Sequence, residues 1–157
     1  AEIRYTLKQE GIVYIYMGKE FGARREDEAL YDRNGKLDFE KTAQSRLFKS
    51  GLERIIQGVK KGYTIALMCA EKNPMECHRC ILVGREIDKL EGLSVENIMA
   101  DGSLLSQKQV GENLLEIYCA DRNQISIAEV LTGEQKPEGY YLDKAYRKRA
   151  EEIAYQI

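Results

Sequence analysis

One short stretch of the chain carries most of its reactive side chains. LMCAEKNPMECHRC, residues 67–80, contains Cys69, Cys77, Cys80 and the only histidine, His78. The apolar run before Cys69 is typical of a buried strand, and the residues after it are typical of the start of a helix. A thiol at a helix N-terminus is stabilised as the thiolate by the helix dipole. Cys69 is therefore a candidate nucleophile.

The polar neighbours of Cys69 add to this chemistry. Glu71 is a candidate general base, and His78 is a candidate proton carrier near neutral pH. Arg79 could hold a carboxylate or a phosphate through two parallel hydrogen bonds. We therefore predict Cys69, Glu71 and His78 as catalytic residues, with Arg79 as a binding residue for an anion.

Cysteine and histidine are also the ligands that zinc prefers. Cys69, Cys77 and His78 would supply three of them, but adjacent side chains on a helix diverge by about 100°. The sequence also has no second CxxC pair. These points argue against zinc, and no cofactor is predicted; a catalytic zinc held by those three residues is the weaker alternative. Cys77 and Cys80 are interpreted as core residues on one face of a helix predicted over 74–91.

The elements expected to position these residues alternate between strand and helix. Apolar, β-branched runs predict buried strands, and apolar residues at helical spacing predict helices. Such alternation is typical of a three-layer α/β fold with a mostly parallel sheet, Rossmann-like or flavodoxin-like. The predicted strands are 12–17, 64–68 and 95–100, and the predicted helices are 47–61, 74–91 and 104–118. Asp38 is predicted to cap a short helix that begins at Phe39, and Asn73 is predicted to cap the helix over 74–91.

Ligands of parallel α/β sheets bind at the carboxyl ends of the strands, so the loops there are expected to meet. The loop GKEFGARR, residues 18–25, supplies Gly18 for close backbone approach and Arg24 as a cation, with Arg25 beside it. Asp101 follows the third strand. We predict Gly18, Arg24, Arg79 and Asp101 as substrate-binding residues. The alternatives are a solvated surface for the cations and a simple Asp-Gly turn for Asp101.

The length and the net charge of the chain limit the classes of protein to which it can belong. The 157 residues predict a single domain over 1–157, with a polar loop over 19–45 that is a candidate mobile cover for the site and a packing segment over 137–157. The net charge of −2 gives no general attraction to nucleic acid. No apolar run approaches the roughly 18 residues of a membrane span. Reduced cysteines and a cytoplasmic location are expected.

The order of several motifs resembles the bacterial domain-of-unknown-function family 488. The motifs are GKEFGAR, LYDRNGKLDF, ALMCAEKNPMECHR and IMADGS. The resemblance implies an α/β domain, and the family brings no settled activity. The family's opening strands are missing here, so we expect a domain truncated at its N-terminus. The signature positions that the resemblance implies are Cys69, Glu71, Cys77, His78, Arg79, Gly18, Arg24 and Asp101.

Together these observations favour an enzyme, or a ligand-binding protein, for a small anion. The ligand would carry phosphate or carboxylate and could be nucleotide-like, and the reaction class is left open. The alternatives are a nucleic-acid-associated, repair-type module and a non-catalytic interaction domain. In the last case the partner would be a second copy of the chain or the missing N-terminal segment.

Overall fold

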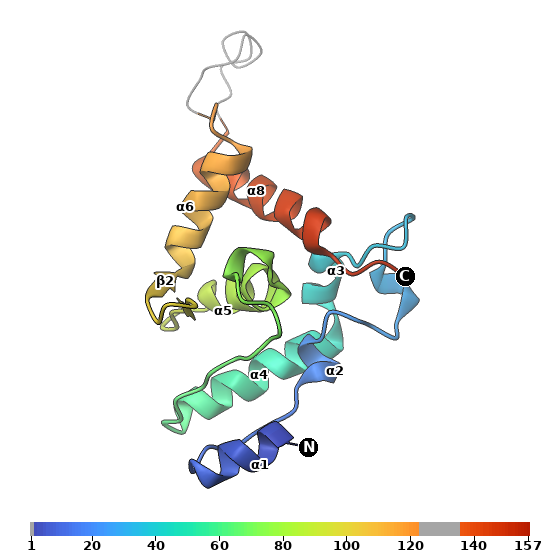
Figure 1. Ribbon diagram of the computed structural model, residues 1–157. Coiled ribbons are helices and arrows are strands. Elements are labelled where there is room, and N and C mark those ends of the chain that lie inside the picture. The colour runs from blue at the N-terminus through green and yellow to red at the C-terminus, as the bar shows by residue number, and fades with distance from the viewer. Residues whose placement is uncertain (1, 123–135) are drawn as a thin grey trace, which may run out of the picture.

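The structure is a computed structural model that describes residues 2–122 and 136–157. Within these residues it is built mainly of helices, joined by extended segments and one small sheet (Figure 1). The α-helices are α1 (Glu2–Gln9), α2 (Gly18–Phe21), α3 (Phe39–Gln44), α4 (Arg46–Lys60), α5 (Arg85–Asp88), α6 (Gln107–Tyr118) and α8 (Glu138–Ile153). There are also 3₁₀-helices η1 (Glu28–Leu30) and η2 (Pro74–Glu76), a π-helix η3 (Arg79–Gly84), and strands β1 (Glu96–Ile98) and β2 (Leu104–Ser106).

The prediction of a three-layer, mostly parallel sheet was wrong. The described residues contain one sheet, in which β1 and β2 pair antiparallel with Glu96 opposite Ser106. The runs 12–17 and 64–68 belong to no helix or strand. β-branched residues favour an extended backbone, yet a strand also needs a neighbour to pair its amides and carbonyls. Neither run has such a neighbour among the described residues.

The first unpaired run leaves apolar side chains in contact with water. Val13 is 82% exposed and Tyr16 is 63% exposed, where the sequence pattern had predicted burial on both faces. Leu104, predicted to begin a helix, lies instead in β2. The helix begins three residues later, at Gln107, because Ser106 caps it.

Two helix predictions were confirmed, and both depend on capping residues. The Asp38 side chain accepts a hydrogen bond from the Lys41 amide at 3.0 Å and begins α3. The Ser45 hydroxyl accepts one from the Phe48 amide at 3.3 Å and begins α4, which was predicted over 47–61. Both helices lie within or directly after the segment 19–45, which also contains α2 and η1.

The helix predicted over 74–91 is divided into pieces. Asn73 caps η2 as predicted, its side chain accepting from the Met75 amide at 3.1 Å. Cys77 then leaves the helical region, with φ −114° and ψ 126°. The chain coils again from Arg79, first as η3 and then as α5. Cys77 and His78 are therefore not successive positions of one helix.

The π-helix η3 lies at the centre of the core (Figure 1). Cys80, Ile81, Leu82 and Val83 are each at most 3% exposed, as expected of a helix that is apolar all round. Helix α8 packs against both α6 and η3, and α2 packs against α4. Between α2 and α4, the rings of Phe21 and Phe48 pack edge to face, with their centroids 5.2 Å apart.

A buried amide ties three elements to the core. The Gln107 side chain, 3% exposed, donates to the Cys80 carbonyl at 3.1 Å and to the Tyr146 hydroxyl at 2.9 Å. Its own carbonyl accepts from Asn97 at 3.1 Å and from the Cys80 thiol at 3.6 Å. Gln107 thereby satisfies buried polar groups of η3, α8 and β1 at once.

The cap of α6 offers a direct test of this local structure. Ser106 and Gln109 form a capping box, in which each side chain bonds the other's backbone amide. We expect Ser106→Ala to lower the free energy of unfolding by about 1 kcal/mol, measured by urea denaturation. Ser50→Ala is the control, because its hydroxyl bonds only its own helix, at Leu47. Equal losses in both variants would contradict the capping role.

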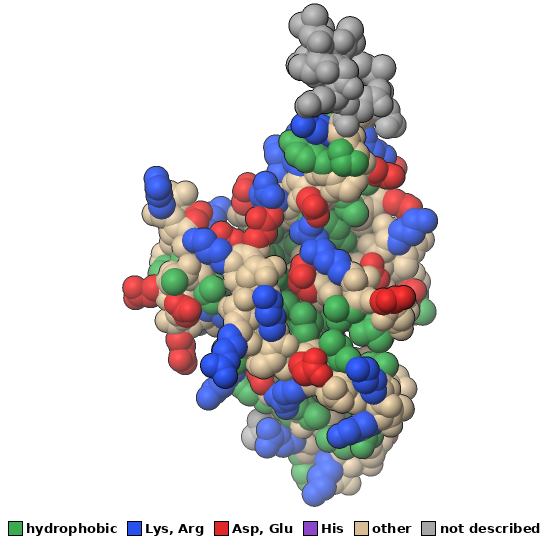
Figure 2. Space-filling view, turned by 180° about the vertical axis from the view of Figure 1, so that it is seen from behind, with side chains coloured by type: hydrophobic (Ala, Val, Ile, Leu, Met, Phe, Trp, Pro, Cys, Tyr) green, Lys and Arg blue, Asp and Glu red, His purple; other side chains and the backbone are tan. Residues whose placement is uncertain are grey.

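The surface carries charges of both signs. On the face shown in Figure 2, basic and acidic side chains are interspersed rather than gathered by sign. Among the described helices, none combines the length and the apolar character needed to cross a membrane.

Candidate functional site

Four side chains of the segment 69–78 converge on one point. The Cys69 thiol donates to Glu71 Oε2 at 2.5 Å and lies 3.7 Å from His78 Nδ1. The Cys77 thiol donates to the same Glu71 oxygen at 3.5 Å. One sulfur, nitrogen or oxygen atom from each of the four lies within 4.8 Å of the others. We call Cys69, Glu71, Cys77 and His78 the cysteine–histidine cluster.

The broken helix explains how the cluster forms. The single turn of η2 reverses the chain after Asn73, and the extended Cys77 then returns its thiol to Glu71. His78 follows at the entry to η3 and faces the same point. Cys80 does not join the cluster, because its thiol points to Gln107. Cys77 and Cys80 are both buried, as predicted. Cys77 is also a member of the cysteine–histidine cluster.

The cluster holds its groups in unequal protonation states. The hydrogen bond from the Cys69 thiol lowers the pKa of Glu71, so this carboxylate is charged at neutral pH. Burial raises the pKa of the Cys77 thiol to about 12, so it stays protonated. Burial lowers the pKa of His78 from 6.5, against the opposing charge of Glu71. Neutral imidazole therefore predominates at pH 7.

Arg25 brings an unusual cation to the edge of the cluster. Its guanidinium donates to the Lys19 carbonyl at 2.6 Å, and Tyr31 bonds its backbone amide and carbonyl. The remaining nitrogens, Nε and Nη2, are buried and have no acceptor among the described residues. Burial lowers the pKa of Arg25, and the charges of Arg25 and Arg79 both act to lower the pKa of His78.

Two glycines shape the loop that carries Arg25. A Cβ on Gly22 would lie 2.3 Å from the Gly18 carbonyl oxygen, a backbone atom that cannot move aside. A Cβ on Gly18 would overlap the Tyr16 ring. The tight turn of α2 brings the backbone of Phe21 close to the His78 ring, and this neighbour acts to raise the pKa of His78. The loop 18–25 thus meets the cluster.

Two predicted site residues make their interactions elsewhere. The Arg24 guanidinium lies over the Tyr155 ring, 4.8 Å from its centroid. Asp101 is exposed and accepts from the Ser103 hydroxyl at 2.6 Å and from the Ser103 amide at 2.9 Å, as a turn residue does. Of the predicted site residues, the structure brings together Cys69, Glu71 and His78, with Arg79 near enough to affect the imidazole.

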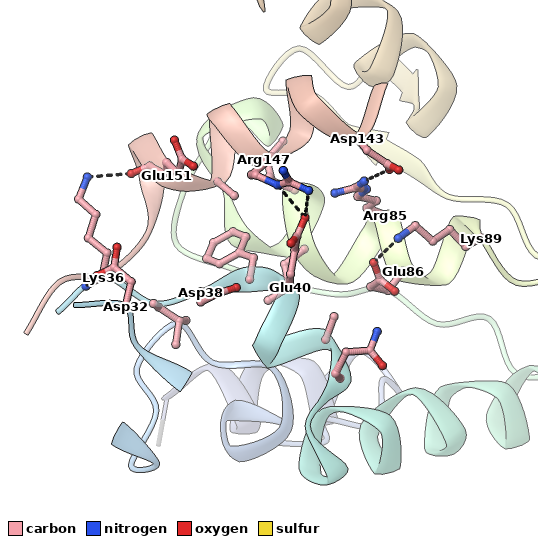
Figure 3. Close-up of a pocket in the computed structure, with 17 residues that line it drawn as sticks. Asp32, Lys36, Asp38, Glu40, Arg85, Glu86, Lys89, Asp143, Arg147 and Glu151 are labelled. Atoms are coloured by element: carbon pink, nitrogen blue, oxygen red, sulfur yellow. Dashed lines mark hydrogen bonds and ion pairs between the residues drawn. The ribbon is translucent and has the colours of Figure 1, made fainter. Parts of the chain in front are cut away.

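A groove of about 600 Å³ lies on another part of the molecule, between α3, α5 and α8 (Figure 3). Several of its charged side chains are paired with one another: Arg147 with Glu40 at 2.9 Å, and Arg85 with Asp143. Lys89 pairs with Glu86 at 2.6 Å. Because these charges already have partners, the groove lacks the free donors found at Arg25.

Sequence reasoning did not select Arg25 as a site residue or find the groove. Arg24 and Arg25 are equivalent in the sequence, and no local pattern indicates which side chain turns inward. The groove joins residues more than one hundred positions apart, such as Glu40 and Arg147. Gly22 predicts a tight turn close to Arg25, but it does not indicate the direction of the Arg25 side chain.

Comparison with known proteins gives a family but no activity. The family model described as "Domain of unknown function DUF488" matches residues 1–85, more than half of the 157-residue chain. The match includes both the loop 18–25 and the cysteine–histidine cluster. Neither the curated proteins nor the solved structures provide a match. The chain belongs to the DUF488 family, a domain of unknown function.

Proposed function

We propose that the protein binds a small anion, carrying phosphate or carboxylate, where the loop 18–25 meets the cysteine–histidine cluster. The observation that carries the proposal is Arg25, whose Nε and Nη2 are buried without an acceptor among the described residues. A buried N–H without a partner costs roughly 1–3 kcal/mol, and more when the group is charged. An oxyanion at this position would accept from both nitrogens and remove that cost.

The surroundings of Arg25 add a second cation and a set of reactive side chains. Arg79 adds a second positive charge, since both guanidiniums lower the pKa of His78. The anion would lie beside a thiol, a neutral imidazole and a charged carboxylate, from Cys69, His78 and Glu71. Proton transfer by His78 and attack by Cys69 are the reactions that such a set can perform on a bound substrate. An enzyme acting on a small anionic substrate is the function that this arrangement supports best.

Binding of inorganic phosphate tests the proposal. We expect phosphate to bind the wild-type protein in isothermal titration calorimetry, and to raise its melting temperature as its concentration rises. Arg25→Gln should weaken binding by at least about tenfold, because it removes a charge-assisted pair of hydrogen bonds worth roughly 1.5–3 kcal/mol each. A carboxylate such as citrate, titrated in the same way, identifies which oxyanion the site prefers.

Arg24→Gln is the matched control, since it removes the neighbouring charge from over the Tyr155 ring. It should leave phosphate binding within about twofold of wild type. If Arg25→Gln lowers the folded fraction, Arg79→Gln supplies the second test of the cationic site. Equal effects of Arg24→Gln and Arg25→Gln, or no phosphate binding at millimolar concentration, would overturn the proposal. Steeply salt-dependent binding of an oligonucleotide instead would favour a nucleic-acid module.

A further inference from the structure

We propose that the cysteine–histidine cluster binds one zinc ion, with Cys69, Cys77, His78 and Glu71 as ligands. This inference goes beyond the anion site, because zinc binding requires neither Arg25 nor a bound anion. With zinc bound, Cys69 and His78 serve as ligands, so their roles as nucleophile and proton carrier belong to the metal-free cluster. It also departs from the expectation drawn from the sequence. That expectation rested on a helix running through Cys77 and His78, and the chain is extended at Cys77.

Two of the distances between these ligand atoms fall within the range of a tetrahedral zinc site, and all four atoms lie within 4.8 Å of one another. With bonds of about 2.3 Å to sulfur and about 2.0–2.2 Å to nitrogen or oxygen, the ligand atoms of zinc lie roughly 3.3–3.8 Å apart. Cys69 Sγ is 3.7 Å from His78 Nδ1, and Cys77 Sγ is 3.5 Å from Glu71 Oε2. The distance between Cys69 Sγ and Glu71 Oε2, 2.5 Å, is shorter than this range. Glu71 would have to retreat by about 1 Å, which its exposed side chain allows.

The types of ligand select among metals. Two sulfurs with one imidazole and one carboxylate match zinc, whereas calcium and magnesium prefer oxygen ligands alone. All four ligands come from a single segment of ten residues, 69–78, which the Asn73 cap and η2 hold in a tight reversal. His78 also lies close to the backbone of Phe21, a neighbour of the kind that orients histidine ligands.

The burial of the four side chains defines the form of the site. Cys77 is fully buried, Cys69 and His78 are half-buried, and Glu71 is exposed. The exposed carboxylate is the ligand that an incoming group can displace most easily. A site with three inner ligands and one replaceable ligand resembles catalytic zinc sites, which keep one position open.

Metal titration of the reduced, metal-free protein tests the inference. We expect one zinc ion per chain, measured by competition with a chromophoric chelator. Cobalt should give the visible bands of tetrahedral coordination together with thiolate-to-cobalt charge transfer from two sulfurs. Cys69→Ser and His78→Gln should each weaken zinc binding by at least about 100-fold. Removing a group that only supports a metal ligand already lowers metal affinity by up to about 100-fold, and removing the ligand itself should cost more. Cys69→Ser should also halve the charge-transfer band.

The remaining cysteines supply matched controls. Cys80→Ser and Cys119→Ser should bind zinc like wild type, since their thiols face Gln107 and the Tyr141 carbonyl. Cys77, Cys80 and Cys119 are all buried, so zinc binding is compared only between variants whose circular dichroism shows the same folded fraction as wild type. No zinc binding by reduced wild-type protein, or an equal loss in Cys80→Ser and Cys69→Ser, would overturn the inference. Arg25→Gln should not weaken zinc binding, because it removes a positive charge that acts on His78 and no ligand atom. Loss of phosphate binding without loss of zinc binding would therefore distinguish failure of the anion site from failure of the metal site.

Discussion

Phe48→Ala is expected to lower the free energy of unfolding by about 3–5 kcal/mol, a large part of the stability of a domain of this size. Phe48 is fully buried and contacts the Phe21 ring edge to face. Truncation removes its apolar contacts and leaves a cavity between α4 and α2, the helix that leads into the loop carrying Arg25. Urea denaturation monitored by circular dichroism measures the loss.

Leu47→Ala is the control for this effect, because the neighbouring side chain on α4 is 48% exposed. It should cost less than about 1 kcal/mol, as substitutions of exposed residues usually do. Similar losses for Leu47→Ala and Phe48→Ala would mean that the contact between α2 and α4 is not part of the stable core.

The second large effect is expected at Gln107. Gln107→Leu keeps the size of the side chain but leaves the Cys80 carbonyl, the Tyr146 hydroxyl and the Asn97 amide without this partner. Each buried polar group that loses its partner costs roughly 1–3 kcal/mol. Because Asn97 and Tyr146 keep other bonds, to Leu105 and to the Gln107 carbonyl, we expect a total loss of about 2–4 kcal/mol. Urea denaturation at neutral pH provides the measurement.

A double-mutant cycle separates the hydrogen bonds from general packing. Tyr146→Phe removes one partner of Gln107 without changing the ring, so the losses of Gln107→Leu and Tyr146→Phe should sum to more than the loss of the double variant. Gln57→Leu is the surface control, since its amide bonds only Glu53 on the same helix. Additive losses in the cycle would show that the Gln107–Tyr146 bond does not contribute to stability.

The parts of the fold that sequence patterns predicted are those decided by local interactions. Helices α3 and α4 begin at Asp38 and Ser45, whose side chains satisfy free amides of the first turn. A cap and its helix lie within a few residues of each other, so one stretch of sequence contains both. The π-helix was not predicted. Its apolar residues are buried on every side, so the sequence there lacks the alternation of apolar and polar residues from which a helical period is determined.

The sheet could not be predicted for a different reason. The runs 12–17 and 64–68 have the composition of strands, yet neither forms one. Whether extended backbone becomes a sheet depends on pairing with a distant segment, which no local pattern records. Only the antiparallel pair of β1 and β2 forms among the described residues, and a short turn containing Gly102 joins it, with φ +83°.

The candidate site was predicted where residues are close in sequence. Cys69, Glu71 and His78 lie within ten positions, so a single turn is enough to bring them together. No local feature of the sequence favours Arg24 over Arg25, because neighbouring side chains in an irregular loop can point in different directions. Cys77 was assigned to the core on a helical face, and the interruption at Cys77 also gave it a place in the cluster.

The π-helix has a consequence for how the chain tolerates deletions. Its hydrogen bonds span five residues rather than four, so η3 holds one residue more than an α-helix would need. Removing one residue from the segment 79–84 would convert the π-turn to an α-helical turn without rotating α5 about its axis. Arg85 would then keep its contacts with Asp143 and with the Tyr146 ring, whose centroid is 4.4 Å from its guanidinium. A deletion within the regular helix α4, by contrast, would rotate the residues after it by about 100°.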